Sequence, residues 1–331
     1  MPSDLLALRY LSRADVEAAG VTTEAVIGVL EIAFREKGEG RVEMPPKPGV
    51  HPWIEGERDN FIHAMPAWIP ALDAVGIKWI SGYPGNQRRG LPYIAGLLVL
   101  NDPLTGIPTC VMDATWVTAV RTAGASAVSA RRLARPDSTT LGILGCGVQG
   151  VVHVDALRIV LPGIAHVRAY DPDPARTAAF AASVRERHGM RVEIVCEPEL
   201  AVRGTDVVVT AGPILRVPHA TIRAGWFETG AFASAVDFDS YWAPEALAEL
   251  DVFTTDDREQ LEHFREIGYF KQIPAIDADL GELVTGRHPG RTAPGQRTMA
   301  CNLGLALDDI AVAPLVLRAA EEKGIGTILP L

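Results

Sequence analysis

Apolar and polar positions alternate in different patterns in the two halves of this chain. In residues 61–112, short apolar runs such as 76–81 and 93–100 alternate with Gly/Pro turns, which predicts a mostly antiparallel sheet. From residue 139 onward, strands of β-branched residues alternate with helices of about 10–15 residues, which predicts parallel βαβ units. The fold class is therefore predicted to be α/β, with a Rossmann-type, doubly wound parallel sheet in the second half.

Individual elements follow from the same pattern. In the second half, strands are expected at 139–145, 166–171, 191–196, 205–212, 231–236 and 252–255, and helices at 148–160, 174–188 and 304–323. In the first half, residues 22–37 carry a helical apolar stripe that threonines open and Gly38 closes. Prolines make 44–52 an extended loop, and a helix of small residues at 113–133 connects the halves.

Composition and charge narrow the class of protein. A length of 331 residues suggests two domains of ordinary size. A net charge of -10 without a strong basic patch argues against nucleic-acid or anionic-membrane partners. Residues 1–12 lack a secretory pattern, and the longest apolar run is far shorter than the roughly 20 residues of a membrane span. The four cysteines lie far apart, so we expect reduced thiols, no metal site and a cytoplasmic location.

The sharpest chemical signal is the run Gly145-Cys146-Gly147-Val148-Gln149-Gly150, which follows one expected strand and opens a helix. In a dinucleotide-binding fingerprint, the first glycine makes a tight turn, the second lets the pyrophosphate approach, and the third packs helix against strand. The helix N-terminus then faces the phosphates. We therefore expect Gly145, Gly147, Val148, Gln149 and Gly150 to bind a nicotinamide dinucleotide.

Asp171, which ends the second of these strands, bears on the choice of cofactor. A carboxylate there accepts hydrogen bonds from the ribose hydroxyls and repels a 2′-phosphate, so NAD(H) is predicted in preference to NADP(H). The alternative is that Asp171 caps the following helix, and nearby Arg176 would soften the preference. Ala211 follows a further strand at its carboxyl end, where it either contacts the cofactor or forms an ordinary turn.

Three cations of the first half stand in segments of unusual rigidity. Lys47 lies in the proline loop, Lys78 in an expected strand and Arg121 in the small-residue helix. Cations on rigid supports suggest an anionic ligand, but composition alone leaves open that Lys78 and Arg121 are surface cations that point to water.

An ordered series of motifs resembles the ornithine cyclodeaminase/mu-crystallin family over roughly residues 40–315. The motifs are Lys78, Tyr83-Pro84-Gly85-Asn86, Gly90-Leu91-Pro92, Asn101-Asp102, Thr105-Gly106, Met112-Asp113-Ala114-Thr115, Thr118-Ala119-Val120-Arg121-Thr122-Ala123, the glycine run, Ala235-Val236-Asp237-Phe238-Asp239 and Gly304-Leu305-Ala306-Leu307-Asp308-Asp309.

The resemblance implies a homodimer with two domains. Residues 1–120 together with 305–331 would form a discontinuous α+β substrate and dimerisation domain, and residues 121–304 the Rossmann domain. It also implies an enzyme that uses NAD(H) on an amino acid or a cyclic imine.

Site residues are carried over position by position. The family's substrate lysine matches Lys78, its carboxylate-binding arginine matches Arg121 and its catalytic aspartate matches Asp239; Lys78 is also expected to take part in catalysis, and Thr122 to contact the cofactor. An α-carboxylate needs a fixed cationic clamp, and hydride transfer from Cα needs a carboxylate that takes the proton of the amine.

The sequence departs from the family pattern at two places. Lys47 stands where a second carboxylate-binding arginine is usual, and a lysine lacks the bidentate geometry. The segment that ends at Asp239 carries an additional acid, Asp237, and a bulky Phe238, so Asp237 is the alternative catalytic carboxylate. His51 and His63 either line the pocket or are structural.

Different outcomes remain open from the sequence. A cyclodeaminase would return the hydride after ring closure, whereas a dehydrogenase or imine reductase would leave it transferred. Asp237, Glu55 or Glu57 would hold a distal ammonium in the first case. The alternative to an amino-acid enzyme of this type is a mu-crystallin-like ketimine reductase or a small-ligand binding protein.

Overall fold

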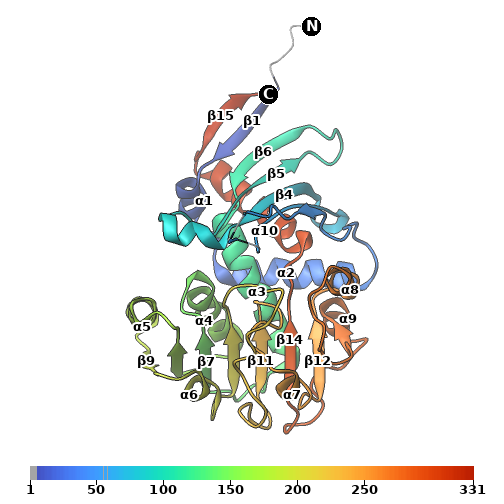
Figure 1. Ribbon diagram of the computed structural model, residues 1–331. Helices are drawn as coiled ribbons and strands as arrows, with labels where there is room; N and C mark the ends of the chain where they lie inside the picture. The colour runs from blue at the N-terminus through green and yellow to red at the C-terminus, as the bar shows by residue number, and fades with distance from the viewer. Residues whose placement is uncertain (1–5, 55, 58) are drawn as a thin grey trace, which may run out of the picture. The chain divides into compact units, whose positions relative to one another are not determined.

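The computed structural model describes residues 6–331 except 55 and 58 (Figure 1). The chain forms two compact units, a first that runs up to Arg121 and resumes at Leu305, and a second that comprises Thr122–Gly304. The expected division placed Arg121 in the second part, whereas it groups with the first.

The first unit is built on a seven-stranded sheet in the order β15-β1-β6-β5-β4-β3-β2. The strands are β1 (Ala7–Leu11), β2 (Gly49–Val50), β3 (Phe61–Ile69), β4 (Ala74–Gly82), β5 (Ile94–Asn101), β6 (Pro108–Asp113) and β15 (Thr327–Pro330). Neighbours are antiparallel except β1 and β6, which are parallel. The terminal strands β1 and β15, which pair in Figure 1, were not expected from the sequence.

Helices cover one face of this sheet. They are α1 (Arg13–Ala19), α2 (Thr23–Gly38) and α10 (Ala306–Glu322), with 3₁₀ turns at Pro70–Leu72 and Pro84–Arg89. Thr22 caps α2 by accepting a hydrogen bond from the Ala25 amide, and Glu39, not Gly38, is the C-cap. The opposite face of the sheet carries the exposed side chains Trp68, Trp79 and Leu97, and Trp79 and Leu97 are direct cross-strand partners.

The second unit contains an eight-stranded parallel sheet in the order β13-β12-β14-β11-β10-β7-β8-β9. The strands are β7 (Thr140–Leu144), β8 (His166–Tyr170), β9 (Arg191–Ile194), β10 (Val207–Thr210), β11 (Phe232–Ala235), β12 (Val252–Thr255), β13 (Ala278–Asp279) and β14 (Thr298–Cys301). The predicted fold class is confirmed. The sequence pattern missed β13 and β14, and β14 inserts between β11 and β12.

The helices of the second unit connect these strands. They are α4 (Val148–Val160), α5 (Pro174–His188), α6 (Pro198–Val202), α7 (Pro244–Leu247), α8 (Arg258–Glu266) and α9 (Leu280–Thr285), while α3 (Thr115–Leu133) begins in the first unit. The predicted bounds of α4 and α5 are confirmed. Within the described part of the chain, no helix combines the length and apolar character that a membrane crossing requires.

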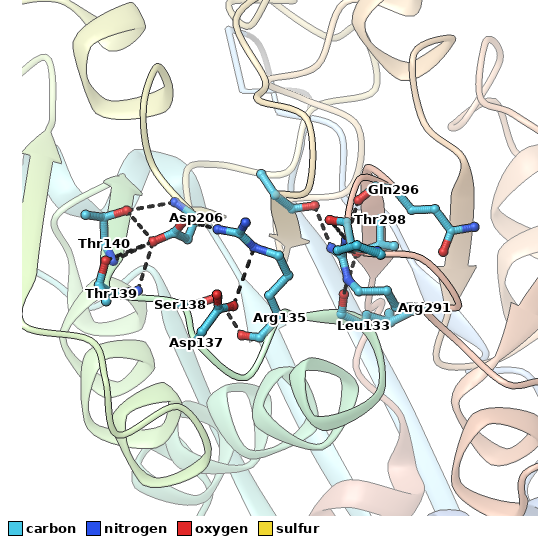
Figure 2. Close-up of polar contacts among 12 residues, drawn as sticks. Leu133, Arg135, Asp137, Ser138, Thr139, Thr140, Asp206, Arg291, Gln296 and Thr298 are labelled. Atoms are coloured by element: carbon cyan, nitrogen blue, oxygen red, sulfur yellow. Dashed lines mark hydrogen bonds and ion pairs between the residues drawn. The ribbon is translucent and has the colours of Figure 1, made fainter.

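Two polar clusters fix the chain that leaves α3 (Figure 2). Asp206 Oδ2 accepts hydrogen bonds from the amides of Thr139 and Thr140 at 2.8 and 3.0 Å, and the other carboxylate oxygen pairs with Arg135. Burial opposes the charge of Asp206, but these hydrogen bonds hold its pKa below the ordinary value. Arg291 Nε donates to Leu133 O at 2.6 Å and so satisfies a carbonyl at the end of α3.

Candidate functional site

The glycine run forms the turn between β7 and the start of α4, and each glycine has its own structural reason. Gly145 has φ of 101°, and a Cβ there would lie 2.6 Å from Ala211 O. A Cβ on Gly150 would lie 2.6 Å from Gly145 O, so this residue allows close packing of α4 against the turn. A Cβ on Gly147 would have no neighbour within 4 Å, which leaves its backbone open to a ligand.

This turn lies where an open parallel sheet binds its ligand. The strand order β9-β8-β7-β10-β11 reverses between β7 and β10, and ligands bind at the carboxyl ends of the strands beside such a switch point. Gly147 caps α4 without a side-chain hydrogen bond, and Val148 in the first turn is 65% exposed. The loop and helix start therefore fit a dinucleotide pyrophosphate, because exposed first-turn amides are the donors that anions need.

Ala211 and Asp171 lie next to the same turn. The Ala211 amide donates to Leu144 O at 2.8 Å, which fixes the end of β10 beside the end of β7. Asp171 Oδ2 accepts from the Cys146 amide at 2.9 Å, so the carboxylate directly contacts the glycine turn. The alternative role of Asp171 as helix cap is wrong, because Asp173 is the N-cap of α5, and Arg176 pairs with Asp173 at 3.5 Å.

A buried polar chain that the sequence did not reveal lies under the glycine turn. His153 is fully buried; its Nδ1 lies 2.7 Å from Gln149 O and its Nε2 3.0 Å from Ser126 Oγ. Ser234 Oγ of β11 donates to Ser126 Oγ at 2.8 Å, and the predicted residue Thr122 receives a hydrogen bond from Ser126 at its carbonyl. Burial lowers the pKa of His153 to about 4, so the ring is neutral and Nδ1 donates to Gln149 O.

The two candidate acids after β11 differ in their surroundings. Asp237 is fully buried and accepts hydrogen bonds from Thr210 Oγ1 at 2.7 Å and from the Gly212 amide at 3.1 Å. Burial raises its pKa to about 7. Asp239 is 6% exposed, and among the described residues its Oδ1 has no hydrogen-bond partner. Burial raises the pKa of Asp239 as well.

Phe238, between these acids, does not present its ring to a ligand. Its φ is 61°, in the left-handed region, and it is almost fully buried. The ring packs against Phe270 and Phe264 with centroid distances of 4.8 and 5.1 Å. The expectation of a bulky aromatic at the site is therefore wrong, because the ring belongs to the core of the second unit.

In the first unit, Lys78 and Arg121 are joined by two acids. Lys78 is 1% exposed and its Nζ lies 2.5 Å from Asp309 Oδ2. Arg121 Nε donates to Asp309 Oδ1 at 3.1 Å and its Nη1 to Asp308 Oδ2 at 3.3 Å. The alternative of surface cations is therefore wrong for both. Burial and the Arg121 charge lower the pKa of Lys78 to about 7, although Asp309 acts in the opposite direction.

Asp308 and Asp309 were quoted from the sequence only as part of a motif. Both lie fully buried in the first turn of α10. The available signal was their position, since two adjacent acids precede the apolar residues 310–313 in a helix that packs on the sheet.

The remaining predicted residues of the first unit differ in burial and in their contacts. Lys47 is buried, and its charge contributes to the low pKa of Lys78 after burial and Arg121. His63 is buried and stacks on Phe61 at 4.5 Å. Glu57 accepts hydrogen bonds from Arg88 and Arg89 at 3.0 and 3.1 Å. Glu55 lies outside the described residues.

Comparisons with known proteins agree with this architecture. The model of the ornithine cyclodeaminase/mu-crystallin family matches residues 9–324. The nodulation efficiency protein NfeD of Rhizobium meliloti is 36% identical over 97% of this chain and 98% of its own. The Thermococcus litoralis Δ1-pyrroline-2-carboxylate reductase, solved with NADH and L-proline, is 29% identical with a TM-score of 0.87 over 97% of this chain and 99% of that one. An archaeal alanine dehydrogenase dimer with bound NAD is 31% identical with a TM-score of 0.85 over 98% and 99%.

Proposed function

The chain belongs to the ornithine cyclodeaminase/mu-crystallin family, and from that premise we propose that it is an NAD(H)-dependent enzyme that interconverts an L-amino acid and its imine. The observation that carries the proposal is the buried pair of cations, Lys78 and Arg121. Burying cations costs free energy, and two buried cationic side chains are suited to an anionic ligand such as an α-carboxylate.

The proposed amino-acid site uses three cations of the first unit. Arg121 supplies planar, directional donors to the carboxylate, and Lys78 supplies a compact charge. Lys47 adds a further charge in place of a second arginine. Substrate binding places an anion beside Lys78, which raises its pKa and favours the charged form.

The proposed cofactor site lies in the second unit. Gly145, Gly147, Val148, Gln149 and Gly150 would hold the pyrophosphate, with Ala211 and Thr122 as further contacts. The nicotinamide supplies a two-electron hydride acceptor or donor. Asp171 supports NAD(H) over NADP(H), because its carboxylate would bind ribose hydroxyls and repel a phosphate.

Asp239 is the proposed proton acceptor. It takes a proton from the substrate ammonium so that the nitrogen lone pair is available while Cα loses a hydride, and it returns the proton in the reverse direction. Its raised pKa supports this role, as does its Oδ1, which has no hydrogen-bond partner in the part of the chain that the structure describes. Asp237, whose oxygens already accept from Thr210 and Gly212, is proposed to hold the ends of β10 and β11.

The proposal favours a dehydrogenase or imine reductase over a cyclodeaminase. A cyclodeaminase must also hold a distal ammonium, for which the sequence offered Asp237 and Glu57 among the described residues. Both already have partners, since Glu57 lies between Arg88 and Arg89. A pure binding protein is disfavoured because it has no use for a buried acid, Asp239, one oxygen of which has no hydrogen-bond partner among the described residues.

We also propose the assembly and the location. The exposed apolar side chains Trp68, Trp79 and Leu97 on the open face of the first unit's sheet support a homodimer, because apolar patches of this kind mark association surfaces. The first unit would then serve substrate binding and dimerisation, and the second cofactor binding. The four free thiols support a reducing, cytoplasmic location.

The test combines the pure protein with a sub-stoichiometric amount of NAD⁺ and a panel of L-amino acids that includes alanine, proline and ornithine. NADH, ammonia and product mass are followed together. We expect NADH to rise in step with amino-acid loss and to stop when NAD⁺ is exhausted, and the matching imine to be reduced in reverse.

Other outcomes would replace the proposal. Ammonia released well beyond the NAD⁺ present, with a cyclic imino acid and no NADH, would establish a cyclodeaminase. Binding of an amino acid without any turnover in either direction would establish a binding protein.

A further inference from the structure

Asp309 occupies an unusual position among the charges of the first unit. Each of its two carboxylate oxygens holds a different cation: Oδ2 lies 2.5 Å from Lys78 Nζ, and Oδ1 accepts from Arg121 Nε at 3.1 Å. The Asp309 side chain is fully buried, and the Lys78 side chain is only 1% exposed. One carboxylate group therefore sets the separation and direction of the two cations.

The neighbouring acid has a different task. Asp308 Oδ2 accepts from Arg121 Nη1 at 3.3 Å and also from the Leu305 amide at 3.0 Å, which closes a capping interaction at the start of α10. Asp308 therefore contacts the guanidinium of Arg121, whereas Asp309 contacts both Arg121 and Lys78. Both acids lie in the first turn of α10.

Lys78 and Arg121 lie close enough to influence each other, since the Arg121 charge lowers the pKa of Lys78. A resident anion is required before a ligand arrives, because adjacent buried cations repel each other and favour loss of the lysine proton.

We propose that Asp309 is the positioning residue of the carboxylate site, where it bridges Lys78 and Arg121 and thereby fixes both cations, charged and correctly spaced, for the substrate. This inference rests on the proposed function, in which those cations bind the α-carboxylate. Asp309 acts through them and does not itself contact the substrate.

A measurable consequence concerns the protonation of Lys78. Burial and Arg121 lower its pKa to about 7, and Asp309 counteracts them. Removing the charge of Asp309 therefore lowers the pKa of Lys78 further, and the lysine loses its proton at a lower pH. The charges that act on it are those of Asp309 on α10, Arg121 on α3 and Lys47, and the titratable His63 lies on the same face of the neighbouring strand β3.

The test compares Asp309→Asn with the matched variant Asp308→Asn in the full-length protein. The dissociation constant of L-proline is measured by calorimetry, and kcat/KM for the amino acid selected by the panel is measured across pH. Asp309→Asn is expected to weaken binding by roughly 30-fold or more near neutral pH. It is also expected to move the alkaline loss of kcat/KM to lower pH.

Asp308→Asn is expected to weaken amino-acid binding, because it removes a contact of Arg121. The alkaline limb, which is the fall of kcat/KM at high pH, should stay at the same pH as in the unmodified protein. The inference is overturned if Asp309→Asn leaves that limb in place, or if both variants move it equally. A purely structural role would lower activity without moving the limb.

A second measurement needs no substrate. Urea unfolding is compared for the unmodified protein, Asp309→Asn, Lys78→Met and the double variant. If Asp309 exists to hold Lys78, the double variant is more stable than the sum of the two single losses predicts. Additive losses would overturn the inference.

Failure of the inference is distinguishable from failure of the proposed function. If amino-acid binding is unchanged in both Lys78→Met and Arg121→Met, the proposed carboxylate site itself is refuted. Binding lost in those variants, together with an unmoved alkaline limb in Asp309→Asn, would refute only the role of Asp309.

Discussion

Thr210 Oγ1 donates a 2.7 Å hydrogen bond to Asp237 Oδ1 and so ties the end of β10 to the segment that follows β11. The Gly212 amide donates to the second oxygen of the same carboxylate. Two residues further along, Asp239 has an oxygen with no such partner among the described residues. Two acids separated by a single residue are thus suited to different tasks, Asp237 to holding the backbone and Asp239 to exchanging a proton.

This contrast predicts the effect of removing each charge. Asp239→Asn should reduce kcat by about 10²–10⁴-fold while the dissociation constants of NADH and the amino acid change little, because only proton transfer is lost. Asp237→Asn should retain most of kcat but lower the midpoint of urea unfolding. Steady-state kinetics and urea titration of both variants check this. The opposite pattern would assign proton transfer to Asp237.

The glycine turn predicts a pair of variants with separate effects. Gly147→Ala adds a methyl group where no atom lies within 4 Å, so the fold should be unaffected while the KM for NAD⁺ rises by roughly tenfold or more. Gly150→Ala places a Cβ 2.6 Å from Gly145 O and should destabilise the protein by about 1–3 kcal/mol. Kinetics and thermal unfolding separate the two. Unchanged NAD⁺ affinity in Gly147→Ala would contradict the assigned pyrophosphate site.

The choice between NAD⁺ and NADP⁺ should depend on Asp171. Replacement by serine removes the charge that repels a 2′-phosphate, so kcat/KM with NADP⁺ should rise and that with NAD⁺ should fall. The ratio of the two values is the measurement. Asp173→Ser, which alters the nearby helix cap and the ion pair with Arg176 but keeps the Asp171 charge, is the control and should change the ratio much less. An unaltered ratio in Asp171→Ser would exclude it as the discriminating residue.

The sequence predicted the parts of this fold whose pattern is local. The glycine run and the helix bounds of α4 and α5 depend on neighbouring residues, and the structure agrees with them. The strand β14 was missed because its four residues, 298–301, contain a single β-branched side chain and follow a long polar loop. Its assignment depends on pairing with β11 and β12, which are distant in sequence.

The contact partners of the predicted site residues also could not be predicted from the local sequence pattern. Lys78 was recognised as a candidate, but its contact with Asp309 joins positions more than 200 residues apart in the chain. Likewise, the link from His153 to Ser126 and Ser234 joins two helices and a strand. Such contacts arise only after packing, so a single sequence identifies the cations without their counter-ions.

The cluster around Asp206 predicts a purely structural effect. Asp206→Ala leaves Arg135 and the amides of Thr139 and Thr140 without their acceptor, and should lower the free energy of unfolding by about 2 kcal/mol or more with KM values unchanged. Asp137→Ala is the matched control, because that exposed carboxylate reaches Arg135 only at 3.8 Å. Urea unfolding measures both, and equal losses would contradict the role of Asp206.

His153 predicts how stability depends on pH. Burial lowers its pKa from 6.5 to about 4, so the unfolded chain binds a proton between these values that the folded protein does not. The stabilisation is present above pH 6.5 and is lost as the pH falls toward 4, by an amount on the order of 3 kcal/mol. Urea unfolding from pH 7.5 to 4.5 should show this loss in the unmodified protein and a smaller one in His153→Gln.

The hydrogen bond from His153 to Gln149 O extends the same prediction to the cofactor. Protonation of the ring turns Nε2 into a donor and places a buried positive charge beside Gln149 in the first turn of α4, where the helix dipole and the burial both disfavour a cation. NADH affinity should therefore weaken at acid pH in the unmodified protein and depend less on pH in His153→Gln. His166→Gln, which replaces a surface histidine beside Glu193, should retain the behaviour of the unmodified protein. Equal pH dependence in all three proteins would show that His153 does not titrate with unfolding or cofactor release.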